Sequence, residues 1–191
     1  MEEAINSAIK KGVPVGGTSA GLAVLGEYSF AALKDTVKSS EALANPFHGR
    51  VTITRDFLHI SLLDGKITDS HFVARDRMGR LLAFLARIAT DGWTRAPFGI
   101  GIDEKTAVLI EADGSARVTG VGAAYFLGTP GPPEQCAPNT ALSYKNVSVY
   151  RLTTGEGRFN VKSWTGSGGV EYKLSVEGGV IASTLPGNEI Y

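Results

Sequence analysis

The spacing of apolar residues predicts two amphipathic helices. Residues 2–10 place apolar side chains at helical spacing, with acidic residues first and lysines last, as the helix dipole favours. A broader apolar stripe over 81–89 predicts a more deeply buried helix, with Asp76 as its N-cap and Asp91-Gly92 at its end. The second segment has the strongest helical pattern in the chain.

Short runs rich in β-branched and aromatic residues predict strands along most of the remaining chain. Residues 28–50 instead mix polar residues with proline and glycine, which indicates a helix fragment and a surface loop. The proline-rich stretch 129–138 indicates a bend within one domain. The predicted strands cover residues 13–15, 51–54, 57–63, 66–68, 98–103, 106–111, 116–119, 123–127, 147–152, 159–163, 170–176 and 180–183.

The order of these elements predicts the fold class. Helices and strands alternate in the first half, whereas turn signals such as Asp113-Gly114 separate strands in the second half. We therefore expect an α/β fold with a mostly parallel central sheet flanked by helices and a C-terminal part rich in β-hairpins. At 191 residues, with 43% hydrophobic residues, the chain has the length and composition of one globular domain over residues 1–191.

Charge and composition narrow the classes of partner that we expect. Nineteen basic and nineteen acidic residues give a formal net charge of zero, so the charge does not favour nucleic acid or an anionic membrane. No run approaches the roughly 18 to 20 apolar residues that span a bilayer, and the first residues lack a signal-peptide core, so we expect a cytoplasmic protein. With one cysteine, Cys136, and three histidines without metal-ligand spacing, we expect neither metal nor cofactor.

The glycine-rich run after residue 15 is the first candidate for chemistry. Its pattern Gly17-x-Ser19-x-Gly21 lies between a predicted strand and helix-forming residues, which is the context of a nucleophile elbow. Small residues on both sides let the backbone take strained dihedral angles and leave the serine hydroxyl exposed. The backbone N–H of Ala20, which follows the serine, is then one oxyanion-hole donor.

A serine nucleophile needs a base, and the base needs an orienting carboxylate. His48 lies in a polar loop and His59 in an apolar, strand-like run. His71 lies between a predicted strand and a helix, where α/β active sites assemble. Asp103-Glu104 ends an apolar, glycine-rich strand, so this pair is either a solvated turn or the source of the orienting acid. The residues alone leave both alternatives open.

Three segments in order, GGTSAG, DSHFVARDRMGRLL and GIGIDEKTAV, resemble the cyanophycinase and aspartyl dipeptidase family of serine peptidases, with cyanophycinase the closer match. That family is similar in fold to class I glutamine amidotransferases but has serine in the elbow. The resemblance implies a triad in which Ser19 is the nucleophile, His71 is the general base and then acid, and Glu104 orients the imidazole.

The resemblance also implies a substrate pocket. The family pattern Asp-Gln-His-Phe is followed by three arginines, and this chain has serine in place of the glutamine, which suggests altered or relaxed specificity. Guanidinium groups bind carboxylates bidentately, which suits an aspartyl substrate, although the arginines are alternatively a solvated helix face. The implied substrate-binding residues are Asp69, Ser70, Arg75, Arg77 and Arg80.

The function implied by the resemblance is a serine hydrolase that forms an acyl-enzyme on an aspartyl or β-aspartyl peptide such as cyanophycin. Family members have further strands and a glycine-rich oxyanion donor before the elbow, whereas this chain begins at the helix just before it. One alternative is therefore a promiscuous carboxylesterase acting on short acyl esters. A second is a non-catalytic hydrolase fold that acts as a binding or assembly module. Strands without neighbours would expose apolar surface, so we also expect a homo-oligomer.

Overall fold

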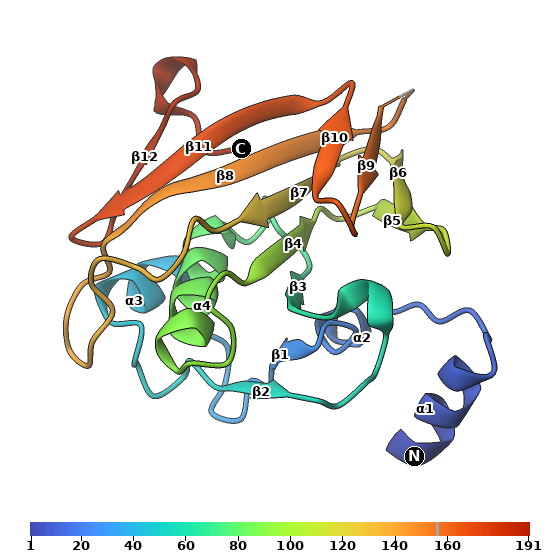
Figure 1. Cartoon of the computed structure of the whole chain (residues 1–191). Coiled ribbons are helices and arrows are strands. Elements are labelled where there is room, and N and C mark those ends of the chain that lie inside the picture. The colour runs from blue at the N-terminus through green and yellow to red at the C-terminus, as the bar shows by residue number, and fades with distance from the viewer. Residues whose placement is uncertain (156) are drawn as a thin grey trace.

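A mixed sheet of eight strands forms the centre of the structure (Figure 1). The structure is a computed structural model and describes residues 1–155 and 157–191. The strands lie across the sheet in the order β12-β11-β8-β7-β4-β3-β1-β2. In chain order they are β1 (Tyr28–Phe30), β2 (Ile53–Arg55), β3 (Lys66–Asp69), β4 (Phe98–Ile102), β7 (Ala123–Gly128), β8 (Tyr144–Thr153), β11 (Val170–Glu177) and β12 (Val180–Ser183).

A smaller, four-stranded sheet has the order β10-β9-β6-β5 and contacts β7 and β8 of the central sheet. Its strands are β5 (Thr106–Ile110), β6 (Ser115–Gly120), β9 (Arg158–Asn160) and β10 (Thr165–Ser167). The helices are α1 (Glu2–Lys10), α2 (Ala20–Ala23), α3 (Ser39–Ala44) and α4 (Met78–Thr90), with two 3-10 turns, η1 (Ser61–Leu63) and η2 (Pro186–Asn188).

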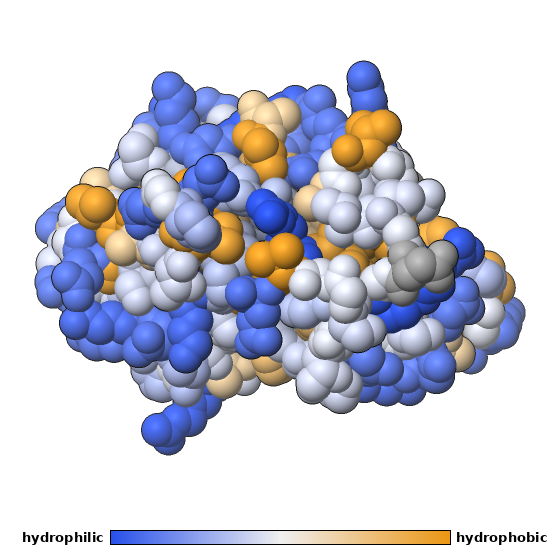
Figure 2. Space-filling model, turned by 90° about the horizontal axis from the view of Figure 1, so that it is seen from above, coloured by the Kyte–Doolittle hydropathy of each residue, from blue (hydrophilic) through white to orange (hydrophobic). Residues whose placement is uncertain are grey.

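The central sheet has an apolar core on each face. Successive side chains of a strand point to opposite faces, so Tyr125 and Leu127 of β7 join the core with α3 and α4. Ala124 and Phe126 of the same strand join the core shared with the smaller sheet. Figure 2 views the molecule from the side of β11 and β12, where polar residues divide the exposed apolar residues into small patches.

The prediction of a mostly parallel sheet is wrong. β3 pairs in parallel with β1 and with β4, and the other neighbouring pairs of the described sheet are antiparallel. After β4 the chain forms the hairpin β5–β6 and then returns through β7, which pairs antiparallel with β4. Parallel pairing needs a crossover connection, and the described chain after β4 makes antiparallel connections instead. The α/β class and the hairpin-rich C-terminal part are confirmed.

Most predicted strands are confirmed with slightly shifted ends, and α4 begins after Arg77 rather than Asp76. The strand predicted over 57–63 is wrong, because this segment ends in the turn η1. Conversely, β1 lies in the polar stretch 28–50 and β10 consists of Thr165, Gly166 and Ser167, so neither segment has a sequence that indicates a strand.

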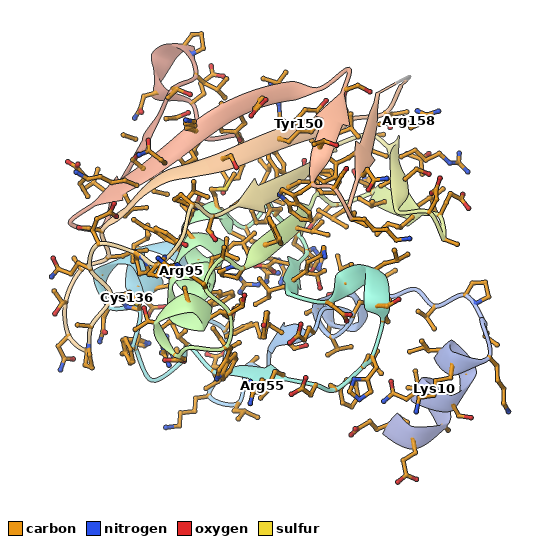
Figure 3. The ribbon with its side chains drawn as sticks, viewed as in Figure 1. Lys10, Arg55, Arg95, Cys136, Tyr150 and Arg158 are labelled. Carbon is orange, nitrogen blue, oxygen red and sulfur yellow. The ribbon has the colours of Figure 1, made fainter. Side chains whose placement is uncertain are left out.

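The strand predicted at residues 13–15 is also absent from the described structure. This segment is an exposed connection between α1 and α2, with Val13 51% and Val15 40% exposed. A strand forms only by pairing, and no described strand lies next to it. The helix predicted over 2–10 is confirmed as α1, which lies apart from the sheet (Figure 1), with Lys10 at the edge of the molecule (Figure 3).

Within the described part of the chain, no helix combines the length and the apolar character needed to cross a membrane.

Candidate active site

Ser19 stands at the start of α2 with φ 53° and ψ −117°, a strained backbone conformation. The turn before it is tight: a Cβ on Gly17 would overlap the carbonyl oxygen of Gly21, so position 17 requires glycine. The Oγ1 of Thr68 on β3 donates to the carbonyl oxygen of Leu22 at 2.6 Å and ties α2 to the end of that strand. The serine therefore occupies a strained turn into a helix, and no described strand precedes it as in a complete nucleophile elbow.

His71 follows β3 and also has a left-handed backbone, with φ 48°. Two hydrogen bonds fasten the next two residues to the end of β4: the N–H of Phe72 donates to the oxygen of Ile102 at 3.2 Å, and that of Val73 donates to Oδ1 of Asp103 at 3.0 Å. Left-handed backbone at a non-glycine residue is often found at functional sites, where surrounding contacts maintain it.

The structure brings Ser19, His71 and Glu104 together although they are far apart in sequence. The Ser19 Oγ lies 2.9 Å from Nε2 of His71, and Nδ1 of His71 lies 2.6 Å from Oε1 of Glu104. A carboxylate only accepts hydrogen bonds, so Nδ1 carries the proton and Nε2 accepts the serine hydroxyl. The order of atoms is that of a serine nucleophile, its base and an orienting acid.

The electrostatics of the acid follow from this contact. The hydrogen bond from His71 lowers the pKa of the Glu104 carboxyl below its ordinary value, and nearby positive charges, Arg75 among them, lower it further. The His71 side chain is 23% exposed and that of Glu104 is 47% exposed. The carboxylate is therefore ionised and partly solvated, in a site that is open to water.

The N–H of Ala20 is the first of α2 and makes no hydrogen bond within the described residues. The first N–H groups of a helix have no partner in the helix itself, so this group is available to an oxyanion next to Ser19. The carbonyl oxygen of Ser19 lies 3.4 Å from the hydroxyl of Ser70, which is a loose contact between the two turns.

Three of the other predicted residues, Asp69, Arg77 and Arg80, form a largely buried ion-pair network beside these three. Asp69, the last residue of β3, is 2% exposed and accepts from Nε of Arg80 at 2.7 Å and from Nη1 of Arg77 at 3.2 Å. Arg77 also donates to the carbonyl oxygen of Ser70 at 2.8 Å. The side chain of Arg80 is 4% exposed, so it holds β3 to α4 and is turned away from solvent. Arg75 is exposed and stays available to a substrate.

Asp103, the other acid of the Asp103-Glu104 pair, has a structural role in the site. Oδ1 of Asp103 accepts the N–H of Val73, and Oδ2 accepts the N–H of Ala123 at 2.9 Å. The side chain thereby joins the loop that carries His71 to the strand end that carries Glu104. Its position in the Asp103-Glu104 pair at a strand end was the one available signal. Among the described residues, no group of three or more histidine, cysteine or acidic side chains has an arrangement suited to a metal ion.

Fold and site together define an α/β protein with a hydrogen-bonded serine, histidine and carboxylate at the edge of a mixed sheet. No protein-family model matches the chain. It is 33% identical over 149 residues to the cyanophycinase of Synechococcus elongatus, covering 74% of this chain and 40% of that protein. It is 29% identical over 164 residues to that of Trichormus variabilis, covering 83% and 49%, and 32% identical over 123 residues to that of Geminocystis herdmanii, covering 64% and 39%.

The part of the chain that aligns with these proteins is similar to cyanophycinases. It spans less than half the length of these curated relatives.

Proposed function

We propose that this chain is a serine hydrolase that acts through an acyl-enzyme. The observation that carries the proposal is the pair of contacts at 2.9 Å and 2.6 Å that joins Ser19, His71 and Glu104. Nε2 of His71 takes the hydroxyl proton as Oγ attacks the acyl carbon, and the same proton then passes to the leaving group. A water molecule then hydrolyses the acyl-enzyme. His71 takes a proton from the water as its oxygen attacks the ester formed with Oγ of Ser19, and His71 returns that proton to Oγ as the carboxylic acid product leaves.

The proposed substrate is an aspartyl or β-aspartyl peptide such as cyanophycin. The support comes from the relatives, which are cyanophycinases, and from the exposed guanidinium of Arg75 near Glu104. The proposed oxyanion donor is the free N–H of Ala20. In this proposal Asp69, Arg77 and Arg80 are positioning residues. Arg77 and Arg80 bind Asp69, and Arg77 also binds the carbonyl oxygen of Ser70, the residue before His71.

Labelling with a fluorophosphonate probe tests the nucleophile, and hydrolysis of cyanophycin and of β-Asp-Arg dipeptide tests the substrate. We expect Ser19→Ala to abolish labelling and to lower hydrolysis by more than about 10³-fold. Ser167→Ala, a change at an exposed serine on β10, is the matched control and leaves both unchanged. Folded protein that fails to label would contradict the proposal and favour a non-catalytic binding or assembly module.

A second candidate is a carboxylesterase acting on short acyl esters. The observation that favours it is the openness of the site, since Ser19 is exposed and Glu104 is 47% exposed. Activated esters have better leaving groups than amides and need less stabilisation of the oxyanion, and one lost donor costs about 10²- to 10³-fold. Rapid, Ser19-dependent hydrolysis of p-nitrophenyl acetate without cleavage of the β-aspartyl dipeptide would select this candidate.

A further inference from the structure

A cavity of about 360 Å³ opens at the sheet edge next to the acid of the candidate triad. Asp103, the neighbour of Glu104, forms one wall of it, and the ends of β7, β8 and β11 form the rest. The residues that matter for its chemistry are Asp103, Tyr125 and Arg151. The mechanism proposed above does not use Tyr125 or Arg151.

Tyr125 is a buried residue whose hydroxyl lacks a partner. The residue is 3% exposed, and its ring packs against Phe72 and Tyr191 at centroid distances of 5.2 Å and 5.9 Å. Tyr125 lines the cavity, and its hydroxyl makes no hydrogen bond with any described residue. The hydroxyl is not among the fully buried atoms without a partner, so it is accessible from the cavity. Burial raises the pKa of Tyr125 to about 12, so the hydroxyl keeps its proton and is a donor at neutral pH. An accessible donor at the end of an otherwise buried side chain is available to a ligand or water in the cavity.

Arg151 supplies positive charge beside that hydroxyl. It lies directly opposite Tyr125 in the β7–β8 pairing and opposite Val170 in the pairing of β8 with β11. Directly opposite side chains in an antiparallel pair have Cβ atoms about 4.5 to 5.5 Å apart and share one face. Tyr150, labelled in Figure 3, points to the other face, toward β10, so Arg151 faces the side of Tyr125.

The guanidinium of Arg151 is half-buried and forms no ion pair or side-chain hydrogen bond within the described residues. The acid on the same cavity, Asp103, already accepts the N–H groups of Val73 and Ala123. The cavity therefore presents a charged donor and a neutral donor side by side, and both lack an acceptor. A carboxylate is the group that a guanidinium and a hydroxyl together bind well.

We propose that this cavity is a carboxylate-binding subsite for an acidic peptide substrate, held by Arg151 and Tyr125. This inference rests on the proposed function for the identity of the substrate. β8 lies two strand spacings, about 10 Å, beyond β4, so the bound carboxylate belongs to a residue well away from the scissile bond. An extended peptide covers that distance in about three residues. The site is thus suited to a chain with several acidic residues rather than to a single short acyl group.

The direct test measures binding without turnover. In the Ser19→Ala background, isothermal titration calorimetry compares acetyl-tetra-aspartate amide with the uncharged acetyl-tetra-asparagine amide. We expect Arg151→Gln to weaken binding of the aspartate peptide by about 10- to 100-fold, because it removes charged hydrogen bonds. Tyr125→Phe removes only the hydroxyl and weakens it by about threefold to tenfold. Arg117→Gln, at an exposed arginine of β6, is the matched control.

Equal affinity for the two peptides, or no effect of Arg151→Gln and Tyr125→Phe, would overturn the subsite. If Arg151→Gln does not fold, Arg151→Lys, which keeps the charge, and Tyr125→Phe decide the question. In the active protein, Arg151→Gln raises KM for an acidic peptide, whereas the control Arg117→Gln leaves it unchanged. Arg151-dependent binding without hydrolysis by the unaltered chain would reject the proposed function alone, whereas hydrolysis without Arg151 dependence would reject the subsite alone.

Discussion

The ring of Phe72 lies against the backbone of Gly101, where a Cβ added to the glycine would come within 2.5 Å of the ring. Phe72 is fully buried and directly follows His71. The glycine in the middle of β4 therefore makes room for the side chain that anchors the candidate base. This contact explains why an apolar strand that needs β-branched residues for its stability has glycine here.

Gly101→Ala tests that anchor. The added methyl displaces the Phe72 ring and with it the loop carrying His71, so we expect a loss of about 1 to 3 kcal/mol in the free energy of unfolding. Hydrolysis falls as well, because small displacements of a base are costly. Urea denaturation and steady-state kinetics measure the two effects. Gly49→Ala, which adds a methyl in open space, is the control, and equal behaviour of the two variants would contradict the prediction.

The ion pair between Asp69 and Arg80 should contribute more to stability than surface pairs do. Both side chains are almost fully buried, at 3% and 4% exposure, so removing one partner leaves an uncompensated charge. We expect Asp69→Asn to lower the free energy of unfolding by about 3 to 5 kcal/mol. Glu177→Gln breaks the exposed pair with Lys145 and costs less than about 1 kcal/mol. Urea denaturation midpoints that shift equally in the two variants would contradict this prediction.

The ionisation of Glu104 should depend on His71. The hydrogen bond from His71 lowers the pKa of this carboxyl in the folded state, so it stays ionised to lower pH than an ordinary glutamate. A depressed carboxyl pKa contributes stability that is present above the unfolded-state pKa and is lost as pH falls through the folded-state pKa. Titration of the Glu104 side-chain carbon by NMR should show the pKa rising in His71→Ala. The same pKa in both proteins would show that the contact is absent in solution.

The exposed segment before Ser19 leads to a prediction about assembly. Val13 and Val15 are 51% and 40% exposed in the connection between α1 and α2, and no described strand pairs with it, which favours pairing with another copy. We expect a homo-oligomer by light scattering coupled to size exclusion at micromolar concentration. Val13→Lys with Val15→Lys should shift it toward monomer, and Val180→Lys, at an exposed valine of β12, is the control. A monomer in the unaltered chain would contradict the prediction.

Local pattern was sufficient for much of the fold. The apolar stripe of α4 and the alternation in β5 and β6 depend on neighbours within one element, so their positions are readable from the chain. Parallel or antiparallel pairing depends on how distant strands meet, which explains why the prediction of a mostly parallel sheet failed. Residues 13–15 have the composition of a strand, but no described strand lies beside them to accept their hydrogen bonds.

For the site, residue types and their spacing were enough to identify the groups that are chemically able to act: a serine between glycines, a histidine after a strand and an acid at a strand end. Three features depend on the folded chain: the distances between these groups, the contact of Arg80 with Asp69, and the pairing of Tyr125 with Arg151 on the neighbouring strand. Residue type sets the chemistry that a side chain can perform. Sheet register and turn geometry, which arise from contacts far apart in the chain, set which side chains meet.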